Sequence, residues 1–441
     1  MTNSKLKDSN IEWLGKIPSN WRLIHNKYIL KKKKEILSKY DNEKILSLTM
    51  NGVIERDLNA GGKMPSSFDG YQKLKKDNLL LCLFDIDVTP RCVGIIPKDG
   101  ITSPAYSQFI LNKKKAYLKY YYYYFLMLDN KKVLVHLSKN LRNTLSEQEF
   151  GSLTSLMPPL EEQKKISTFL DKKIGKIDKV SKKIQQEITD LEEYRKSIIT
   201  KAVTKGLNPN VPMKDSGIPW IGEIPQNWKI IKGKYLFRLL SKPVKKDDQV
   251  ITCFRDGQVT LRVKRRTTGF TMSDQEIGYQ GIDKGDLVVH GMDGFAGAIG
   301  ISDSRGKGSP VLNVLDSNQD KKYMMYCLRA TAQLGVFQAL AKGIRVRSAD
   351  TRWPTLANLK YAIPPQSEQA NVVNYLSNNS YKLNAIIQAK KDLVEKLNQY
   401  KQSIIYEYVT GKKQVPTEEG AVEWEARLTN AMNINNTSLI N

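Results

Sequence analysis

The chain has 441 residues, a length that usually corresponds to two or more domains rather than to a single core. Its 70 Lys and Arg outnumber 45 Asp and Glu, and the net charge of +25 favours a polyanionic partner, although a lysine-rich codon usage would give the same excess. No apolar run approaches the roughly 18 residues of a membrane helix, and no apolar signal region opens the chain, so we expect a cytoplasmic protein that contacts no membrane.

Cysteine and histidine are scarce and scattered along the chain. Cys82, Cys92, Cys253 and Cys327 show no CxxC spacing, and none of the three histidines lies at ligand spacing from another histidine or from a cysteine. We therefore expect reduced cysteines, and neither a disulfide framework nor a metal site.

A segment rich in tryptophan and proline near the N-terminus, residues 11–21, is repeated at residues 218–228, with Trp13 and Trp220 separated by 207 positions. Further matches follow in the same order through both halves: Lys27-Tyr28 with Lys234-Tyr235, Tyr71-Gln72 with Tyr279-Gln280, Ser103-Pro104 with Ser309-Pro310, Leu141-Arg142 with Ile344-Arg345, Pro158-Pro159 with Pro364-Pro365, and Gln163 with Gln369. So many ordered matches indicate a tandem duplication, in which loop insertions and deletions shift the offset slightly.

The first part of each half, residues 1–157 and 217–363, mixes short apolar runs with turn signals. The signals are Asn-Gly and Asp-Gly pairs at 51–52, 99–100, 256–257 and 293–294. This pattern predicts two similar globular α+β domains, each with several strands.

Two segments within these domains could suggest a ligand site. Residues 120–124 are all tyrosine, but the apolar residues that follow favour a packed amphipathic element over a platform for base stacking. Residues 291–297 are rich in glycine but lack GxGxxG spacing, so a bent strand or hairpin is favoured over a nucleotide loop.

A long helix is predicted after each Pro-Pro pair, within residues 158–206 and 364–412, with acidic residues in the first turn. Apolar residues in each helix alternate in steps of three and four, which is the spacing of a coiled-coil seam. The seam residues are Leu170, Ile174, Ile177, Ile184, Ile188, Leu191, Ile198, Leu376, Leu383, Ile387, Val394, Leu397 and Ile404.

The two helices most simply pair with each other. A short linker, residues 207–216, joins the first helix to the second domain, so the second helix would begin beside the end of the first and run back. The expected fold is α+β: two globular domains separated by two long helices that pair as an antiparallel coiled coil, with a pseudo-two-fold internal repeat and a flexible tail at 413–441. A coiled coil between two copies of the chain is the alternative reading of the heptads.

Motifs of an independent enzyme are absent from the sequence. There is no GxxxxGK[ST] phosphate loop, no [DN]PP[YF] run of an amine methyltransferase, and no GxSxG or HExxH motif. We therefore expect a chain that does no catalysis itself and binds no cofactor.

The duplicated segments resemble those of the specificity subunits of type I restriction-modification systems. The resemblance rests on residues 217–228 and their N-terminal counterpart, on the Pro-Pro-Leu-Glu-Glu-Gln entry at 158–163, and on Tyr-Arg-Lys-Ser-Ile-Ile at 194–199. It covers nearly the whole chain, twice and in the same order. The second helix entry departs slightly, with Gln366-Ser367 where the first half has Leu160-Glu161.

The resemblance implies two target-recognition domains, each of which reads one half of a split, asymmetric sequence in double-stranded DNA. It also implies that the paired helices set the spacing of the half-sites and dock two DNA-methyltransferase subunits. Those partners would carry S-adenosylmethionine and methylate adenine, and restriction subunits would add ATP- and Mg²⁺-dependent translocation and cleavage.

Basic residues in both domains are candidates for DNA contact, since arginine can bind guanine through two hydrogen bonds and lysine more often neutralises phosphate. Alternation over 261–264 predicts a strand that buries Leu261 and Val263 on one face. Its other face would present Arg262 and Lys264. For every candidate, solvated surface, phosphate contact and base contact remain open. The candidates are Lys63, Arg91, Lys139, Arg142, Arg255, Arg262, Lys264, Arg265, Arg266, Arg345, Arg347 and Arg352.

Three functions remain open from the sequence. The chain could serve a full restriction complex, it could serve methylation alone or act as an unpaired copy that switches target preference, or it could be a coiled-coil adaptor that binds only proteins. The different basic residues of the two halves disfavour the adaptor, because divergent surfaces on one duplicated scaffold suit two different half-sites.

Overall fold

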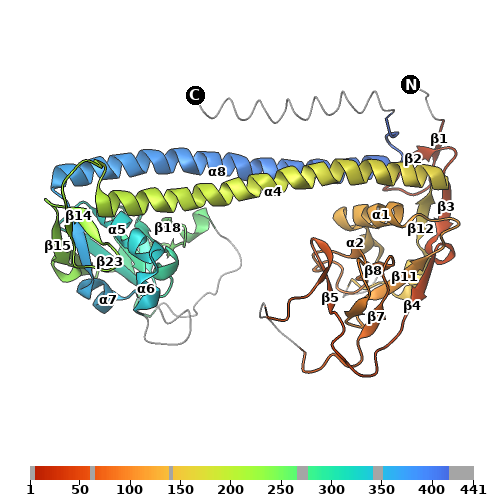
Figure 1. Ribbon diagram of the computed structural model, residues 1–441, viewed down its shortest axis with the longest axis horizontal. Helices are drawn as coiled ribbons and strands as arrows, with labels where there is room; N and C mark the ends of the chain where they lie inside the picture. Colours follow the sequence, from red (N-terminus) through yellow and green to blue (C-terminus); the bar gives the residue numbers. More distant parts are fainter. Residues whose placement is uncertain (1–4, 60–64, 139–142, 266–276, 341–350, 417–441) are drawn as a thin grey trace. The chain divides into compact units, whose positions relative to one another are not determined.

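A computed structural model describes residues 5–59, 65–138, 143–265, 277–340 and 351–416 (Figure 1). The chain divides into two compact units, Met1–Ile184 with Asp392–Asn441, and Gln185–Lys391. Each unit holds one sheet-rich globular part, residues 5–157 or 213–363, and a portion of each long helix.

The first globular part is built on a four-stranded antiparallel sheet with the order β4-β11-β8-β9. Its strands are β4 (Leu30–Lys33), β11 (Ser107–Leu111), β8 (Leu79–Leu81) and β9 (Val93–Ile95). Four two-stranded antiparallel pairs surround it: β1 (Leu6–Asp8) with β2 (Lys16–Pro18), β3 (Arg22–His25) with β12 (Thr154–Met157), β5 (Leu46–Thr49) with β6 (Gly52–Glu55), and β7 (Gln72–Leu74) with β10 (Gly100–Thr102). The short helices are η1 (Asn26–Tyr28), α1 (Leu118–Asn130), α2 (Val133–Leu137) and α3 (Glu147–Ser152).

The second globular part repeats this topology strand for strand. Its central sheet has the order β16-β23-β20-β21, formed by β16 (Phe237–Leu240), β23 (Leu312–Ser317), β20 (Leu287–His290) and β21 (Ile299–Ile301). The same four pairs recur: β13 (Met213–Asp215) with β14 (Glu223–Pro225), β15 (Lys229–Lys232) with β24 (Lys360–Ile363), β17 (Ile251–Cys253) with β18 (Val259–Leu261), and β19 (Gln280–Ile282) with β22 (Gly306–Gly308). Its helices are η2 (Gly233–Tyr235), η3 (Arg262–Lys264), η4 (Gly294–Ala296), α5 (Lys321–Gln333), α6 (Val336–Ala339) and α7 (Trp353–Asn358).

The tyrosine run is part of the core. Four of its five residues, Tyr120, Tyr121, Tyr123 and Tyr124, are buried in α1, and α5 buries the equivalent Tyr323 in the second part. The prediction of a packed element is therefore confirmed. The glycine-rich residues 291–297 likewise connect β20 and β21, which pair as an antiparallel hairpin as predicted.

The long helices α4 (Leu160–Lys205) and α8 (Gln366–Val409) are antiparallel partners. In the first unit the early part of α4 contacts the late part of α8, where the rings of Phe169 and Tyr408 lie 4.5 Å apart. In the second unit the middle parts of the two helices are in contact, where Lys390 Nζ lies 2.7 Å from Glu187 Oε2. The α+β fold with an internal repeat and an antiparallel helix pair is confirmed.

The predicted seam residues lie inward along both helices. Leu191 and Val394 are half-buried, and the other seam residues are buried. Polar residues interrupt the apolar seam, and they pair across it: Lys401 Nζ lies 2.6 Å from Asp178 Oδ1, and Arg195 donates to Asn384 Oδ1 at 2.6 Å. Polar partners at seam positions favour one register of a coiled coil over others.

A buried glutamine joins each globular part to the start of its helix. Gln163 Oε1 accepts the Tyr117 N–H at 2.8 Å, and its Nε2 donates to the carbonyls of Lys115 and Pro158, both at 2.9 Å. Gln369 repeats the arrangement in the second unit, where it accepts the Asp320 N–H and donates to the Pro364 carbonyl. The match of these two glutamines in the sequence thus reflects one shared structural role.

Replacing Gln163 by leucine is expected to destabilise the chain by about 1–3 kcal/mol, because one N–H and two carbonyls lose their buried partner. Urea denaturation followed by circular dichroism measures the change. Gln185→Leu, at an exposed position of the same helix, is the control. Equal stability of the two variants would contradict this role for Gln163.

Candidate nucleic-acid interface

Only part of the predicted DNA-contact set can be placed. Six residues lie outside the described residues: Lys63, Lys139, Arg142, Arg266, Arg345 and Arg347. Of the other six, Arg91 lies in the first globular part and the rest in the second: Arg255, Arg262, Lys264, Arg265 and Arg352.

The predicted strand over residues 261–264 is wrong. Strand β18 ends at Leu261, and residues 262–264 form the single turn η3, which the Arg265 N–H closes by donating to the Arg262 carbonyl at 3.1 Å. Val263 is 60% exposed rather than buried. The alternation fails because the partner strand β17 begins only at Ile251, opposite Leu261, so no paired strand continues beside residues 262–264. Arg262 turns back onto this hairpin and donates to Thr252 Oγ1 at 3.3 Å.

Arg255 lies in the loop that joins β17 to β18, and its side chain is 61% exposed. Its Nη2 donates to Asp293 Oδ1 at 2.9 Å, which leaves its other nitrogens to face solvent. Asp293 is itself fixed, since its N–H donates to His290 Nδ1 at 3.0 Å. Burial lowers the pKa of His290, which keeps the ring neutral and able to accept that hydrogen bond.

Arg265 folds back onto the same loop. It makes two parallel bonds to Asp256, at 2.9 Å and 2.7 Å, and a third to Gln258 Oε1 at 3.0 Å. Its guanidinium lies 4.1 Å from the centre of the Phe254 ring. Burial opposes ionisation of Asp256, but the hydrogen bonds from Arg265 and from the Gln258 N–H outweigh it and hold the pKa of this carboxyl below its usual value.

The loop rests on a half-buried arginine. Arg329, on α5, donates to the Asp256 carbonyl at 2.8 Å, and burial lowers its pKa. A methyl group at Gly257, whose φ is +90°, would lie 2.4 Å from Arg329 Nη1, so this turn requires glycine. We call the resulting group the hairpin-tip cluster, and its members are Phe254, Arg255, Asp256, Gln258, Arg265 and Asp293.

The other described candidates lie around this cluster. Lys264 donates to Ser304 Oγ at 2.8 Å in the loop after β21. Arg352 is the N-cap residue of α7. A methyl group at Gly291 would lie 2.9 Å from the Cγ of Arg352, so this arginine lies beside the loop that carries Asp293. The structure therefore brings Arg255, Arg265 and Arg352 to two adjoining loops.

The first globular part presents a different arginine at the equivalent place. Its β5–β6 hairpin is closed by the short loop Met50-Asn51, and Arg91 Nη2 donates to the Met50 carbonyl at 3.4 Å. Arg91 stands two residues before β9, where the second part has Gly297 two residues before β21. In the first part, then, an arginine reaches the hairpin tip from the loop before β9. In the second part Arg255 lies on the hairpin itself.

Sequence reasoning missed the acidic partners in the hairpin-tip cluster. Asp256 and Asp293 appeared only as halves of Asp-Gly turn signals, and nothing local shows that Asp293 meets Arg255, 38 positions away in the chain. An aspartate that holds an exposed arginine in one orientation reduces the side-chain entropy that the arginine would lose on binding a ligand.

Comparison with known proteins finds relatives of one kind. No protein-family model matches the chain. The putative type I restriction enzyme MjaX specificity subunit of Methanocaldococcus jannaschii is 23% identical over 332 residues, which cover 69% of this chain and 70% of the relative. The type I restriction enzyme MjaVIII specificity subunit of the same organism is 24% identical over 342 residues, 73% of each chain. The chain is therefore similar to specificity subunits of type I restriction enzymes over about two thirds of its length.

The fold of this chain also matches a solved structure. A chain described in work on complex assembly and conformational transition of the type I restriction-modification system superimposes with a TM-score of 0.61 at 13% identity, over 90% of this chain and 99% of that one. In the part of the chain that the structure describes, no helix combines the length and apolar character needed to cross a membrane. Within the same residues, no group of three or more His, Cys, Asp or Glu is placed to hold a metal ion.

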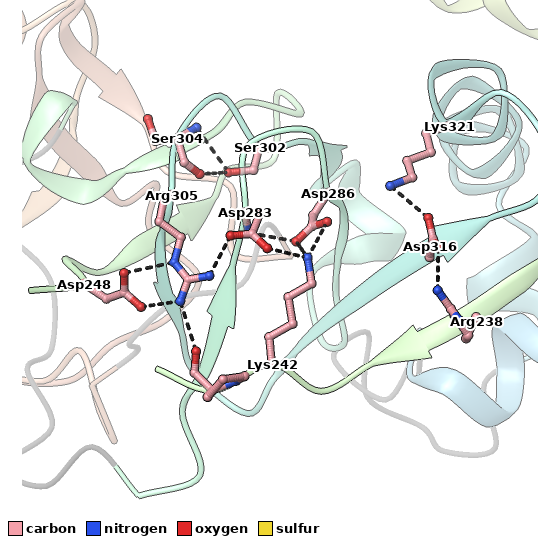
Figure 2. A network of polar contacts seen from close by, with 11 residues as sticks. Arg238, Lys242, Asp248, Asp283, Asp286, Ser302, Ser304, Arg305, Asp316 and Lys321 are labelled. Carbon is pink, nitrogen blue, oxygen red and sulfur yellow. Dashed lines mark hydrogen bonds and ion pairs between the residues drawn. The ribbon is translucent and has the colours of Figure 1, made fainter. Parts of the chain in front are cut away.

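A second cluster of charges in this chain is structural. Figure 2 shows Lys242 and Arg305 reaching toward three aspartates of the second globular part. Lys242 Nζ lies 2.7 Å from both Asp283 and Asp286, and Arg305 lies 2.6 Å from Asp283 and 2.7 Å from Asp248. Because two cations here face three carboxylates, this cluster has no excess positive charge to offer a phosphate.

An ion pair with the charges exchanged occupies the same place in the first half of the chain. Lys75 follows β7 and Asp99 precedes β10, and their side chains lie 2.5 Å apart. At the equivalent ends of β19 and β22 stand Asp283 and Arg305. The exchange keeps the strand pair closed in both halves, so we assign these groups to stability and not to DNA reading.

Acid is expected to open the cluster in the second half. Hydrogen bonds from Lys242 and Arg305 lower the pKa of Asp283 to about 2. Because the pKa of this carboxyl is lower in the folded chain than in the unfolded chain, the ionised group stabilises the fold at pH values above about 4. This contribution is lost as the pH falls from about 4 to about 2. Asp283→Asn should therefore be less stable than the parent at pH 7 and equally stable near pH 2. Thermal denaturation across this range checks it, with the exposed Asp247→Asn as the control.

Proposed function

We propose that this chain is the DNA-reading subunit of its complex and does no catalysis itself. Each globular part would read one half of a split, asymmetric site in double-stranded DNA. The observation that carries this proposal is that two parts with the same strand order present different arginine arrangements at the same hairpin tip. A shared scaffold with different tips suits two different half-sites.

Within the second part, the proposal divides the cations by role. Arg255 and Arg265 are held by aspartates and aim planar guanidinium groups, which suits contact with base edges in the major groove. Lys264 is half-exposed on a flexible stem and suits a phosphate. The excess of 25 positive charges over the whole chain would add affinity that falls with salt.

The paired helices would dock two DNA-methyltransferase subunits and set the distance between half-sites. Helix α4 has 46 residues, so it spans roughly 69 Å at about 1.5 Å per residue, against about 34 Å for one turn of DNA. S-adenosylmethionine would then bind to the methyltransferase partners, and ATP and Mg²⁺ to restriction subunits recruited through them.

Methylation mapping tests the proposal. The chain is co-expressed with the methyltransferase subunit of its own system, and modified adenines are located on the host DNA by long-read sequencing. We expect a split motif that disappears when this chain is omitted. Methylation that is unchanged without the chain, together with no co-purified methyltransferase, would contradict the proposal and favour an adaptor that binds only proteins.

A further inference from the structure

An exposed lysine-tyrosine pair occupies the same place in both halves of the chain. Lys27-Tyr28 lies in η1 and Lys234-Tyr235 in η2, each followed by the first strand of the central sheet. Tyr28 is 55% exposed and Tyr235 is 63% exposed. In each pair the lysine Nζ lies over the ring of its neighbour, 5.2 Å and 4.9 Å from the ring centre.

Other matched residues of the two halves have a role inside the fold. Trp21 and Trp228 are fully buried, and Gln163 and Gln369 bind buried backbone groups. Neither Tyr28 nor Tyr235 has such a role, since no residue within the described ranges makes a hydrogen bond to either hydroxyl group. Large exposed aromatic rings that recur in both halves indicate a task that both halves perform in the same way.

The position of these pairs separates them from the proposed reading face. Each pair adjoins β4 or β16, at one edge of the central sheet, whereas the hairpin tip adjoins β9 or β21 at the other edge. Three strand spacings, roughly 14 Å, lie between the two edges. The reading faces differ between the halves, while these edges carry the same pair.

Exposed cations lie beside both pairs, and a hollow adjoins the second. Tyr235 lines a pocket of about 300 Å³ together with Arg238, Asp316 and Asn318. Arg238 is 76% exposed and pairs with Asp316 at 2.9 Å, and its first-half counterpart, Lys31, is also exposed. Tyrosine and arginine are enriched at protein interfaces, and the lysines of the two pairs add a positive charge that calls for an acidic partner surface.

We propose that Lys27-Tyr28 and Lys234-Tyr235 are two copies of one docking surface, each of which binds an acidic patch on one of two identical methyltransferase subunits. The proposal rests on the function proposed above and adds a contact at the sheet edge to the contact on the helices. Two copies of one partner explain why the pair recurs on parts whose hairpin tips differ. A sequence-independent phosphate contact could recur in the same way, and the experiment separates the two.

The experiment compares the full-length chain with Tyr28→Ala, Tyr235→Ala and the double variant. Native mass spectrometry counts the bound copies of the methyltransferase subunit of the same system, and titration measures each affinity. We expect two copies on the parent, one copy bound about tenfold more weakly in each single variant, and both weakened in the double variant. Tyr28→Phe, which keeps the ring, should bind as the parent does, and so should Val88→Ala, which alters another exposed apolar side chain of the first part.

Two results would overturn this docking surface while leaving the proposed function intact. One is a double variant that binds two methyltransferase copies with the parent's affinity. The other is a double variant that keeps both copies but, as the isolated chain, loses affinity for all DNA sequences alike, which would identify phosphate contacts. A parent chain that binds no methyltransferase subunit would instead contradict the proposed function itself.

Discussion

Replacing Arg255 and Arg265 by alanine is expected to cost about 1–3 kcal/mol of cognate DNA binding for each arginine and to relax the choice of base at the positions that each reads. Both side chains are held by aspartates, at 2.9 Å and 2.7 Å. Their removal also leaves Asp256 and Asp293 without their arginine partners, and these carboxylates would then repel phosphate. Titration of duplexes that differ from the cognate site by single base pairs measures both effects.

Lys264→Ala is the matched comparison for these arginines. A lysine that contacts only phosphate should weaken all sequences alike and lower the salt dependence of binding by about one ion. If the arginine variants show this uniform loss, Arg255 and Arg265 contact phosphate and the base-reading assignment is wrong. If they keep full affinity and full discrimination, the hairpin-tip cluster is not part of the reading face.

Leu170→Ala is expected to lower the free energy of unfolding by about 2–5 kcal/mol, which is the range for removing a fully buried leucine. Leu170 is 0% exposed on the seam of α4. Its loss leaves a cavity where α4 contacts the late part of α8 within the first unit. Denaturation by urea, followed by the circular dichroism of the helices, gives the change.

Lys179→Ala, at an exposed position of the same helix, is the control and should change stability by less than about 0.5 kcal/mol. An equally small effect at Leu170 would mean that the seam position is not packed as described.

The sequence predicts the scaffold well because the residues that define it act locally or repeat. The matched segments at 11–21 and 218–228 include the buried Trp21 and Trp228, so their recurrence reveals the duplication before any strand is placed. The helices follow from their heptads, since burial on one stripe requires apolar residues at steps of three and four.

The interface could be predicted only in part, because it depends on contacts between distant loops. Arg255 was predicted from charge alone, but its partner Asp293 lies 38 positions away, in the loop that joins β20 to β21. The strand expected over 261–264 was predicted from alternating apolar and charged residues. Alternation indicates a strand only where a partner strand lies beside it, and β17 begins only at Ile251, opposite Leu261. Local patterns give the residue types of a site but not the pairs that orient them.

The central claim is that each globular part reads one half of a split DNA site. Exchange of residues 217–363 for the equivalent part of a type I specificity subunit, followed by long-read mapping of methylated adenines, tests it most directly. We predict a motif in which one half changes while the other half and the spacer length stay the same. A motif in which both halves change, or in which neither changes, would contradict the claim.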